Sequence, residues 1–415
     1  MKRICMVALL AVFLLAGCTQ TGWVSENGHT SYYDDHGLIL TGWQNIEGKW
    51  FYFDHAGQLQ TGWLELGEGR CYLNEQGNPI TGWQTLEGKT YLLREKGFVT
   101  TGWQNTDRGR RYFHEDGTMA TGRLELEEGT YFLDETGAAL TGWQTTEDGQ
   151  RYLDDQGRGV QGLTRLPEGL YCFSEGIYAT GWVEEAGNTY FFDENGTAAT
   201  GWREYGQYRR YFDSDGVMAV GPKIIDEVQY YFTPKGYELL LTNKDNPLPE
   251  EFPLDIVKVG PGCYMDSQVA QDYERMMADL KAAGLGVGVT SSYRNFIDQR
   301  GAFNRKVMEF MDMGYSYEDA QKEAQTRVSR PGTSEHQTGL AVDLEGWDGL
   351  MWLKEHCWEY GFIVRYPEGK SHITGVIYEP WHFRYVGVEI AMDMKDTGLC
   401  LEEYLQAVEA ELPET

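Results

Sequence analysis

Residues 41–60 read TGWQNIEGKWFYFDHAGQLQ, and variants of this twenty-residue unit fill the first half of the 415-residue chain. Thr-Gly-Trp opens the unit, an aromatic run follows, and a polar turn with Gly57 closes it. Aromatic and polar residues that alternate between glycine turns predict a short β-hairpin. A hairpin of this size cannot bury a core alone, so a fixed period predicts a solenoid of stacked hairpins.

The unit occurs in eleven copies that stay in register. It resembles the choline-binding or glucan-binding repeats of Gram-positive surface proteins, and the resemblance covers about residues 19–235. It implies an all-β hairpin solenoid that binds the cell wall. The Thr-Gly-Trp copies begin at Thr21, Thr41, Thr61, Thr81, Thr101, Thr141, Thr180 and Thr200, and degenerate copies begin at Thr121, Gln161 and Val220.

Choline-binding repeats hold their ligand in an aromatic cage by cation–π attraction. The resemblance assigns the cage to the Trp of Thr-Gly-Trp, as in Trp43 and Trp63, and to a second aromatic nine residues after the Thr. Trp50 fills this second position once, whereas most of the other units carry Thr, Arg or Gln there. We therefore expect most units not to bind choline. A cell-wall glycan or teichoic acid is the expected ligand, and a spacer without a ligand is the alternative.

The second half of the chain carries two motifs with metal chemistry. Residues 334–343 read SEHQTGLAVD, and residues 379–382 read EPWH. Two histidines and an aspartate, His336, His382 and Asp343, suit Zn²⁺ with a fourth position open for water. Zinc would lower the pKa of that water and polarise a carbonyl. Glu379, three residues before His382, is the candidate base that takes the proton.

The same motifs resemble the VanY-like D-alanyl-D-alanine carboxypeptidases, with a further match at Ser292-Tyr293-Arg294. The resemblance implies an α+β domain with a small antiparallel sheet, Zn²⁺ held by the two histidines and the aspartate, and Glu379 as base. It assigns Arg294 to the substrate carboxylate or developing oxyanion, and Ser334 and Gln299 to substrate contacts. The implied reaction removes D-alanine from peptidoglycan stem peptides. The alternatives are an L,D-carboxypeptidase, a D-Ala-D-Ala dipeptidase, or a non-catalytic wall-binding protein.

The N-terminus has the features of a secretory signal. Lys2 and Arg3 precede an apolar run that is too short to span a bilayer, and Leu15-Ala16-Gly17-Cys18 resembles a bacterial lipobox. This resemblance implies a lipidated Cys18 and a membrane anchor on the outer face; an ordinary cleaved signal is the alternative. The net charge of −29 excludes a nucleic-acid partner, because a polyanion would be repelled.

We therefore predict a multi-domain, extracytoplasmic protein at a bacterial surface: an N-terminal all-β solenoid followed by an α+β zinc peptidase domain. Apolar spacing predicts a helix over 270–283, a strand over 285–290 and helical sequence over 299–328 that is interrupted near Gly314. The scattered cysteines predict packed free thiols, with one disulfide as an alternative. The predicted boundaries are 1–18 for the signal peptide, 19–237 for the repeats, 238–395 for the peptidase and 396–415 for an acidic tail.

Overall fold

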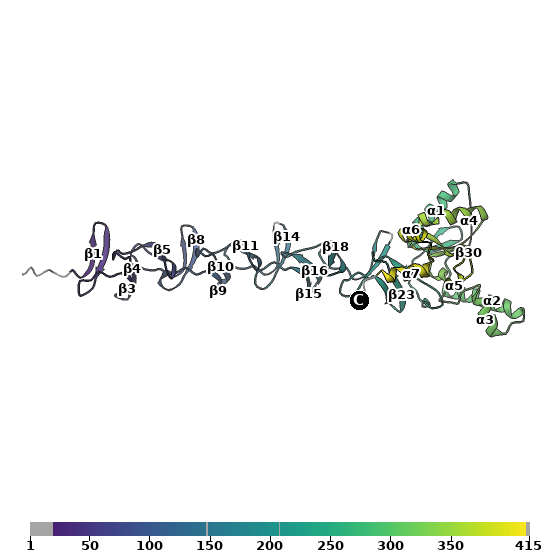
Figure 1. Cartoon of the computed structure of the whole chain (residues 1–415), viewed down its shortest axis with the longest axis horizontal. Helices are drawn as coiled ribbons and strands as arrows, with labels where there is room; N and C mark the ends of the chain where they lie inside the picture. Colours follow the sequence, from purple (N-terminus) through teal and green to yellow (C-terminus); the bar gives the residue numbers. More distant parts are fainter. Residues whose placement is uncertain (1–19, 147, 207, 412–415) are drawn as a thin grey trace, which may run out of the picture. The chain divides into compact units, whose positions relative to one another are not determined.

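The computed structural model describes residues 20–146, 148–206 and 208–411 (Figure 1). The chain divides into two compact units. The first holds the repeats up to Thr164 together with residues 172–179, and the second holds residues 165–171 and everything from Thr180 onward. No helix within the described ranges has the length and apolar character needed to cross a membrane. The predicted signal peptide and Cys18 lie outside the described residues.

Most repeats fold as two-stranded antiparallel hairpins, as predicted (Figure 1), whereas the strands between residues 142 and 178 join in a five-stranded sheet and those between residues 221 and 240 in a three-stranded sheet. The strands of successive hairpins are β1 (Gly22–Glu26) and β2 (His29–Tyr33), β3 (Gly42–Ile46) and β4 (Lys49–Phe53), β5 (Gly62–Leu66) and β6 (Gly69–Leu73), β7 (Gly82–Leu86) and β8 (Lys89–Leu93), β9 (Gly102–Thr106) and β10 (Gly109–Phe113), β11 (Gly122–Leu126) and β12 (Gly129–Leu133), and β13 (Gly142–Thr146) and β14 (Gly149–Leu153). They continue with β15 (Gly162–Leu166), β16 (Gly169–Ser174), β17 (Ile177–Tyr178), β18 (Gly181–Glu185), β19 (Asn188–Phe192), β20 (Gly201–Tyr205), β21 (Tyr208–Phe212), β22 (Gly221–Ile225), β23 (Val228–Phe232) and β24 (Glu238–Leu240).

Two turn types explain why the unit needs its polar and glycine residues. Glu47 and Gly48 both have positive φ, as a two-residue type I′ hairpin turn requires. After the aromatic run, the Asp54 carboxylate accepts hydrogen bonds from the backbone N–H groups of Ala56 and Gln58. Gly57 also has positive φ, and a Cβ there would overlap Ile39 of the preceding repeat. A side chain at position 57 would therefore be strained and would push neighbouring repeats apart.

Neighbouring hairpins share a core and backbone hydrogen bonds. The side chains of Phe51 and Phe53 on β4 are buried. The Trp23 ring of the preceding repeat lies 4.9 Å from the Phe51 ring and 5.9 Å from the Phe53 ring, centroid to centroid. The N–H of Leu59 donates to the carbonyl of Thr30 at 2.7 Å, which joins successive repeats through their backbones. Each hairpin therefore buries its aromatic face against its neighbour, which is the predicted solenoid packing.

The second unit contains an α+β domain, so the predicted fold class is confirmed. A four-stranded antiparallel sheet runs in the order β27-β28-β30-β29, and a separate hairpin pairs β25 with β26. The strands are β25 (Ile256–Gly260), β26 (Cys263–Asp266), β27 (Gly288–Ser291), β28 (Ala341–Glu345), β29 (Phe362–Tyr366) and β30 (Glu379–Tyr385). The helices are α1 (Ala270–Ala282), α2 (Phe296–Asp312), α3 (Tyr317–Gln325), α4 (Trp347–His356), α5 (Ser371–Thr374), α6 (Val388–Thr397) and α7 (Leu401–Ala410).

The local predictions agree with these elements. Helix α1 ends one residue before the predicted 270–283, and β27 overlaps the predicted strand at 285–290. The predicted interruption near Gly314 separates α2 from α3, and Gly314 has a φ of 97°. Cys71, Cys263, Cys357 and Cys400 are buried free thiols.

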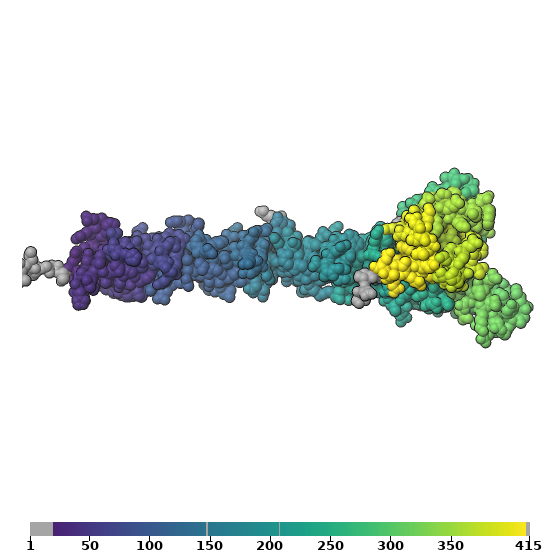
Figure 2. Space-filling view, viewed as in Figure 1, coloured from purple at the N-terminus to yellow at the C-terminus, as the bar shows by residue number. Residues whose placement is uncertain are grey.

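Two hydrophobic clusters hold the α+β domain together. In the first, Val342, Leu344 and Phe383 of the sheet pack with Tyr273 and Met276 of α1. In the second, α6 and α7 pack against the chain that follows the last hairpin; its members include Leu239, Leu241, Ile390, Leu401, Tyr404, Leu405 and Val408. The segment expected as an acidic tail thus contains α7, which is yellow in Figure 2 and supplies part of this core.

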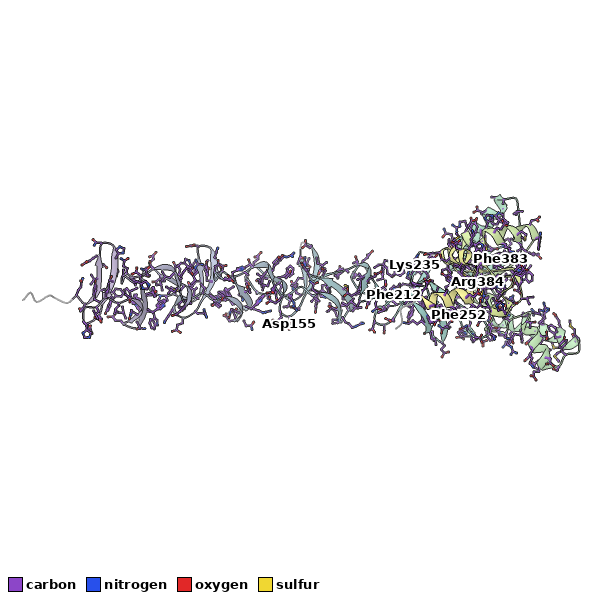
Figure 3. All side chains as sticks on the ribbon, viewed as in Figure 1. Asp155, Phe212, Lys235, Phe252, Phe383 and Arg384 are labelled. Atoms are coloured by element: carbon purple, nitrogen blue, oxygen red, sulfur yellow. The ribbon has the colours of Figure 1, made fainter. Side chains whose placement is uncertain are left out.

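Four buried charged side chains link the sheet to α7. The Glu335 carboxylate accepts from Arg365 Nε at 2.9 Å and from Arg384 Nη1 at 2.6 Å, while Arg365 also makes two hydrogen bonds to Glu402 at 2.9 Å and 2.7 Å. Arg384, labelled in Figure 3, donates in addition to the carbonyl of Leu240. Burial alone would raise the pKa of Glu335, but Arg384 and Arg365 outweigh it and hold the pKa at about 2. Two cations and two anions therefore neutralise one another in the interior.

We expect Glu335→Gln to destabilise the second unit. The substitution keeps the side-chain shape but leaves two buried guanidinium groups facing one carboxylate, so the free energy of unfolding should fall by about 3–5 kcal/mol. Urea unfolding of the full chain, followed by helical far-UV ellipticity, measures this change because α1 to α7 all lie in the second unit.

Glu318→Gln is the matched control. Glu318 pairs with Lys322 on the exposed face of α3 at 3.1 Å, and its loss should change the free energy of unfolding by less than about 1 kcal/mol. Equal losses of unfolding free energy in the two variants would show that Glu335 contributes no more to stability than an exposed ion pair does.

Candidate metal centre

Strand register brings the sequence motifs together. Asp343 on β28 lies directly opposite His382 on β30, and on its other side it pairs with Ser291 at the end of β27. Along β28, Val342 and Leu344 point into the hydrophobic cluster, which leaves Asp343 on the opposite face. Asp343 therefore lies on a strand whose packed face fixes the position of its carboxylate.

His336, Asp343 and His382 present their ligand atoms to one point. One ligand atom from each lies within 4.8 Å of those of the other two, and no other described residues form such a group of histidine, cysteine or acidic side chains. Asp343 Oδ2 lies 3.0 Å from His336 Nε2, and Asp343 Oδ1 lies 2.8 Å from His382 Nδ1. Two imidazole nitrogens and a carboxylate are a donor set that fits Zn²⁺ and leaves a position open.

The orientation of His336 is set by its neighbours. It lies on the short 3₁₀ helix η3 (Glu335–Thr338), and its Nδ1 is 2.9 Å from the carbonyl oxygen of Ser292. That contact leaves Nε2 facing Asp343. Burial lowers the pKa of His336 to about 4, so the ring is neutral at neutral pH and its nitrogen lone pair is available. Burial opposes ionisation of Asp343, but the two neighbouring histidines outweigh it and hold its pKa below the usual range.

Glu379 lies beside the three ligand candidates. Its Oε2 is 3.8 Å from His382 Nδ1. Residues three apart on a regular strand point to opposite faces, but the pairing of β29 with β30 shifts register between Val364 and Tyr366, where Glu379 pairs. Such an irregularity re-aims a side chain and places Glu379 on the same side as His382. Burial raises the pKa of Glu379, an effect that the charge of Asp343 reinforces.

Arg294 follows β27 and reaches the same site. Its Nη2 is 3.9 Å from Asp343 Oδ2, its Nε donates to Ser291 Oγ at 3.0 Å, and its Nη1 donates to Gln299 Oε1 at 3.0 Å. The backbone N–H of Arg294 donates to the carbonyl of His336. These contacts fix a partly exposed cation next to the candidate metal position.

Two further predicted residues lie close to these groups. Gln299 is fully buried on α2, accepts from Arg294 and donates to the carbonyl of Ser329 at 2.7 Å. This geometry makes it a support for Arg294. Ser334 is buried at the residue before η3, and its side chain makes no capping hydrogen bond there.

Sequence reasoning missed the residues that support the ligands. Glu335, the residue before His336, binds two arginines and thereby holds η3 in place. The Tyr366 ring lies 5.0 Å from the His382 ring, centroid to centroid. A signal was present, since Arg365 interrupts the apolar and aromatic run of β29 and Arg384 lies between Phe383 and Tyr385. A charged residue at such a position indicates a buried partner.

The candidate ligand aromatics of the repeats differ in their surroundings. The rings of Trp43 and Trp50 stand at 89° with centroids 6.5 Å apart. The Trp63 ring is covered by the guanidinium of Arg70, at 3.9 Å from its centroid. Trp43 and Trp50 thus lie beside each other, whereas the described rings next to Trp63 are those of Tyr72 and Tyr91.

Comparison with known proteins gives matches to both halves of the chain. Residues 262–388 match the family model of the VanY D-alanyl-D-alanine carboxypeptidases, and residues 40–78 and 179–222 match the choline-binding repeat. A D-alanyl-D-alanine carboxypeptidase of Enterococcus faecalis is 40% identical over 177 residues, which cover 41% of this chain and 66% of that relative. The chain thus spans just under two thirds of the length of this curated relative.

Two further relatives are covered more completely. A solved structure of a variant of the vancomycin-resistance D,D-pentapeptidase VanY, in complex with Zn(II), is 39% identical, with a TM-score of 0.38 and coverage of 40% of this chain and 97% of that one. The bifunctional D-Ala-D-Ala dipeptidase and carboxypeptidase VanXYC of Enterococcus gallinarum is 33% identical over 187 residues, which cover 40% of this chain and 92% of that relative. The chain therefore belongs, through its C-terminal domain, to the VanY family of D-alanyl-D-alanine carboxypeptidases.

Proposed function

We propose that this chain is a zinc-dependent carboxypeptidase that removes the C-terminal D-alanine from peptidoglycan stem peptides. The observation that carries the proposal is one cluster in which His336, Asp343 and His382 converge beside Glu379 and Arg294. The names of the two enterococcal relatives support the substrate class, because both include D-Ala-D-Ala carboxypeptidase activity.

The proposed ligands are His336 Nε2, the Asp343 carboxylate and His382 Nδ1. Zinc bound by these atoms would polarise the scissile carbonyl and lower the pKa of water. Glu379 then accepts a proton from the attacking water and delivers it to the leaving amine. The raised pKa of Glu379 suits this exchange, since it makes the carboxylate a better base and its protonated form an available acid.

Arg294 is proposed to bind the free carboxylate at the C-terminus of the substrate. Its guanidinium is fixed by Ser291 and Gln299 and is 26% exposed, so it can accept an anionic partner. A charge-assisted hydrogen bond of this kind distinguishes a carboxypeptidase substrate from an internal peptide bond. Ser334 is proposed as a further substrate contact, and Gln299 acts through Arg294.

The repeats and the N-terminus support a cell-surface location. Repeats that match the choline-binding model are proposed to hold the enzyme at the wall through a glycan or teichoic acid, which raises its effective concentration near the polymer. Residues 1–18 are proposed to act as a lipoprotein signal, with Cys18 as the lipidated residue that anchors the chain to the outer face of the membrane.

Product analysis on defined muropeptides tests the proposed reaction. The full chain loaded with zinc should release one alanine from a stem pentapeptide, a chelator should stop the release, and added zinc should restore it. Release from a tetrapeptide alone would instead make the enzyme an L,D-carboxypeptidase, and hydrolysis of free D-Ala-D-Ala alone a dipeptidase. Absence of all three reactions would leave a wall-binding protein.

Glu379→Gln should separate catalysis from metal binding. The amide cannot accept the proton, so kcat should fall by roughly 10²–10⁴-fold while zinc stays bound in a one-to-one ratio. Elemental analysis of the purified protein gives the zinc content. Glu355→Gln, on the exposed side of α4, is the control and should keep full activity. Undiminished hydrolysis by Glu379→Gln would exclude the proposed mechanism.

Arg294→Lys should weaken recognition of the substrate carboxylate. Lysine keeps the charge but loses the planar fork and its two supporting hydrogen bonds, so kcat/KM should fall roughly 10–100-fold. The loss should be confined to substrates with a free C-terminus, because a C-terminal amide offers no carboxylate. Arg300→Lys, exposed on α2, is the control. An equal loss on both substrates would assign Arg294 to the oxyanion or to structure.

A further inference from the structure

The tryptophans of several repeats are covered by cations of the same chain. Guanidinium groups lie over three of these rings: Arg70 is 3.9 Å from the Trp63 centroid, Arg110 is 4.0 Å from Trp103, and Arg209 is 4.4 Å from Trp202. All three arginines occupy the same place in the unit, nine residues after its first residue. In these three units, an arginine therefore stands where the second cage aromatic would be. Its guanidinium lies over the tryptophan ring, where a ligand cation would bind.

Additional contacts hold these guanidinium groups in place. Arg70 Nη1 donates to the carbonyl of Asp116 at 3.1 Å, and Arg110 Nη1 donates to the carbonyl of Gln156 at 2.7 Å, each 46 residues further along the chain. Arg209 Nη1 lies 3.5 Å from the Glu238 carboxylate. A ligand cation would have to break both the ring contact and the polar contact. These rings are therefore closed to external cations.

The pair of Trp43 and Trp50 is filled in a different way. The Lys96 ammonium lies 4.6 Å from the Trp50 centroid and 5.6 Å from the Trp43 centroid, within cation–π range of both rings. It forms no salt bridge or hydrogen bond with any described residue, so the two rings are its contacts. Lys96 lies in the short helix η1 (Glu95–Gly97), two repeats beyond Trp43, and has a φ of 56°.

We propose that Lys96 is an internal competitor at the Trp43–Trp50 pair, and that its ammonium keeps quaternary ammonium ligands out of this pair. A tethered ammonium acts at an effective concentration in the millimolar range, so an external cation must displace it. Lys96 is easier to displace than the three arginines, because its ammonium contacts only the two rings.

Replacement of Lys96 tests the proposal. Lys96→Asn removes the ammonium, and asparagine tolerates the left-handed backbone at this position. Choline chloride titrated into the full chain, followed by calorimetry, should show a dissociation constant at least roughly tenfold lower for Lys96→Asn than for the unmodified protein. Lys96→Arg keeps a cation over the rings and should bind choline as weakly as the unmodified protein.

Two further variants locate the gained site. Trp50→Thr in the Lys96→Asn background restores the residue found in other units and should abolish the gain. Lys89→Asn changes an exposed lysine of the same repeat and should have no effect. Equal choline affinity of the unmodified protein and Lys96→Asn, or a gain that survives Trp50→Thr, would overturn the proposal. Far-UV spectra and melting curves establish that each variant is folded.

Discussion

The geometry of the metal site depends on one buried carboxylate, that of Glu335. It is the sequence neighbour of His336, it is almost fully buried, and it accepts hydrogen bonds from arginines on two adjacent strands. A buried charge is costly unless it is paired and fully hydrogen-bonded, and here both oxygens have a guanidinium partner. The 3₁₀ helix that carries His336 is thereby held against β29 and β30, and β30 also carries His382 and Glu379.

The same network connects the site to distant parts of the chain. Arg365 binds Glu402 of α7, and Arg384 binds the carbonyl of Leu240, where the chain leaves the last hairpin. Both contacts are short and inaccessible to water, so they are screened little by salt. Helix α7 and strand β24 thus fix Arg365 and Arg384, which lie between them in the sequence. Removal of any one partner would leave an uncompensated charge near the histidines.

Much of this was predictable from sequence, and the exceptions have physical causes. The hairpins follow from a repeated turn chemistry, and Asp343 on a strand follows from alternating apolar neighbours, because both signals are local. The position of Glu379 depends on a register shift between β29 and β30, which involves pairing of distant residues. Acidic residues such as Glu402 led to the prediction of a charged tail where the structure has α7. The partner of Glu402 is Arg365, which lies 37 residues away in the sequence. Pairings between such distant residues leave no local pattern.

The two halves of the chain treat their binding groups in opposite ways. At the metal centre, two imidazoles and a carboxylate converge without a guanidinium or ammonium among them, and Arg294 stays 3.9 Å from Asp343. The donors therefore keep lone pairs directed at a common point. In the repeats, the electron-rich faces of several tryptophans already carry an Arg or Lys of the same chain. These rings contribute to packing between repeats, and their cation–π contacts are made with side chains of the same chain. A ligand of the repeats would therefore have to contact groups other than these covered rings.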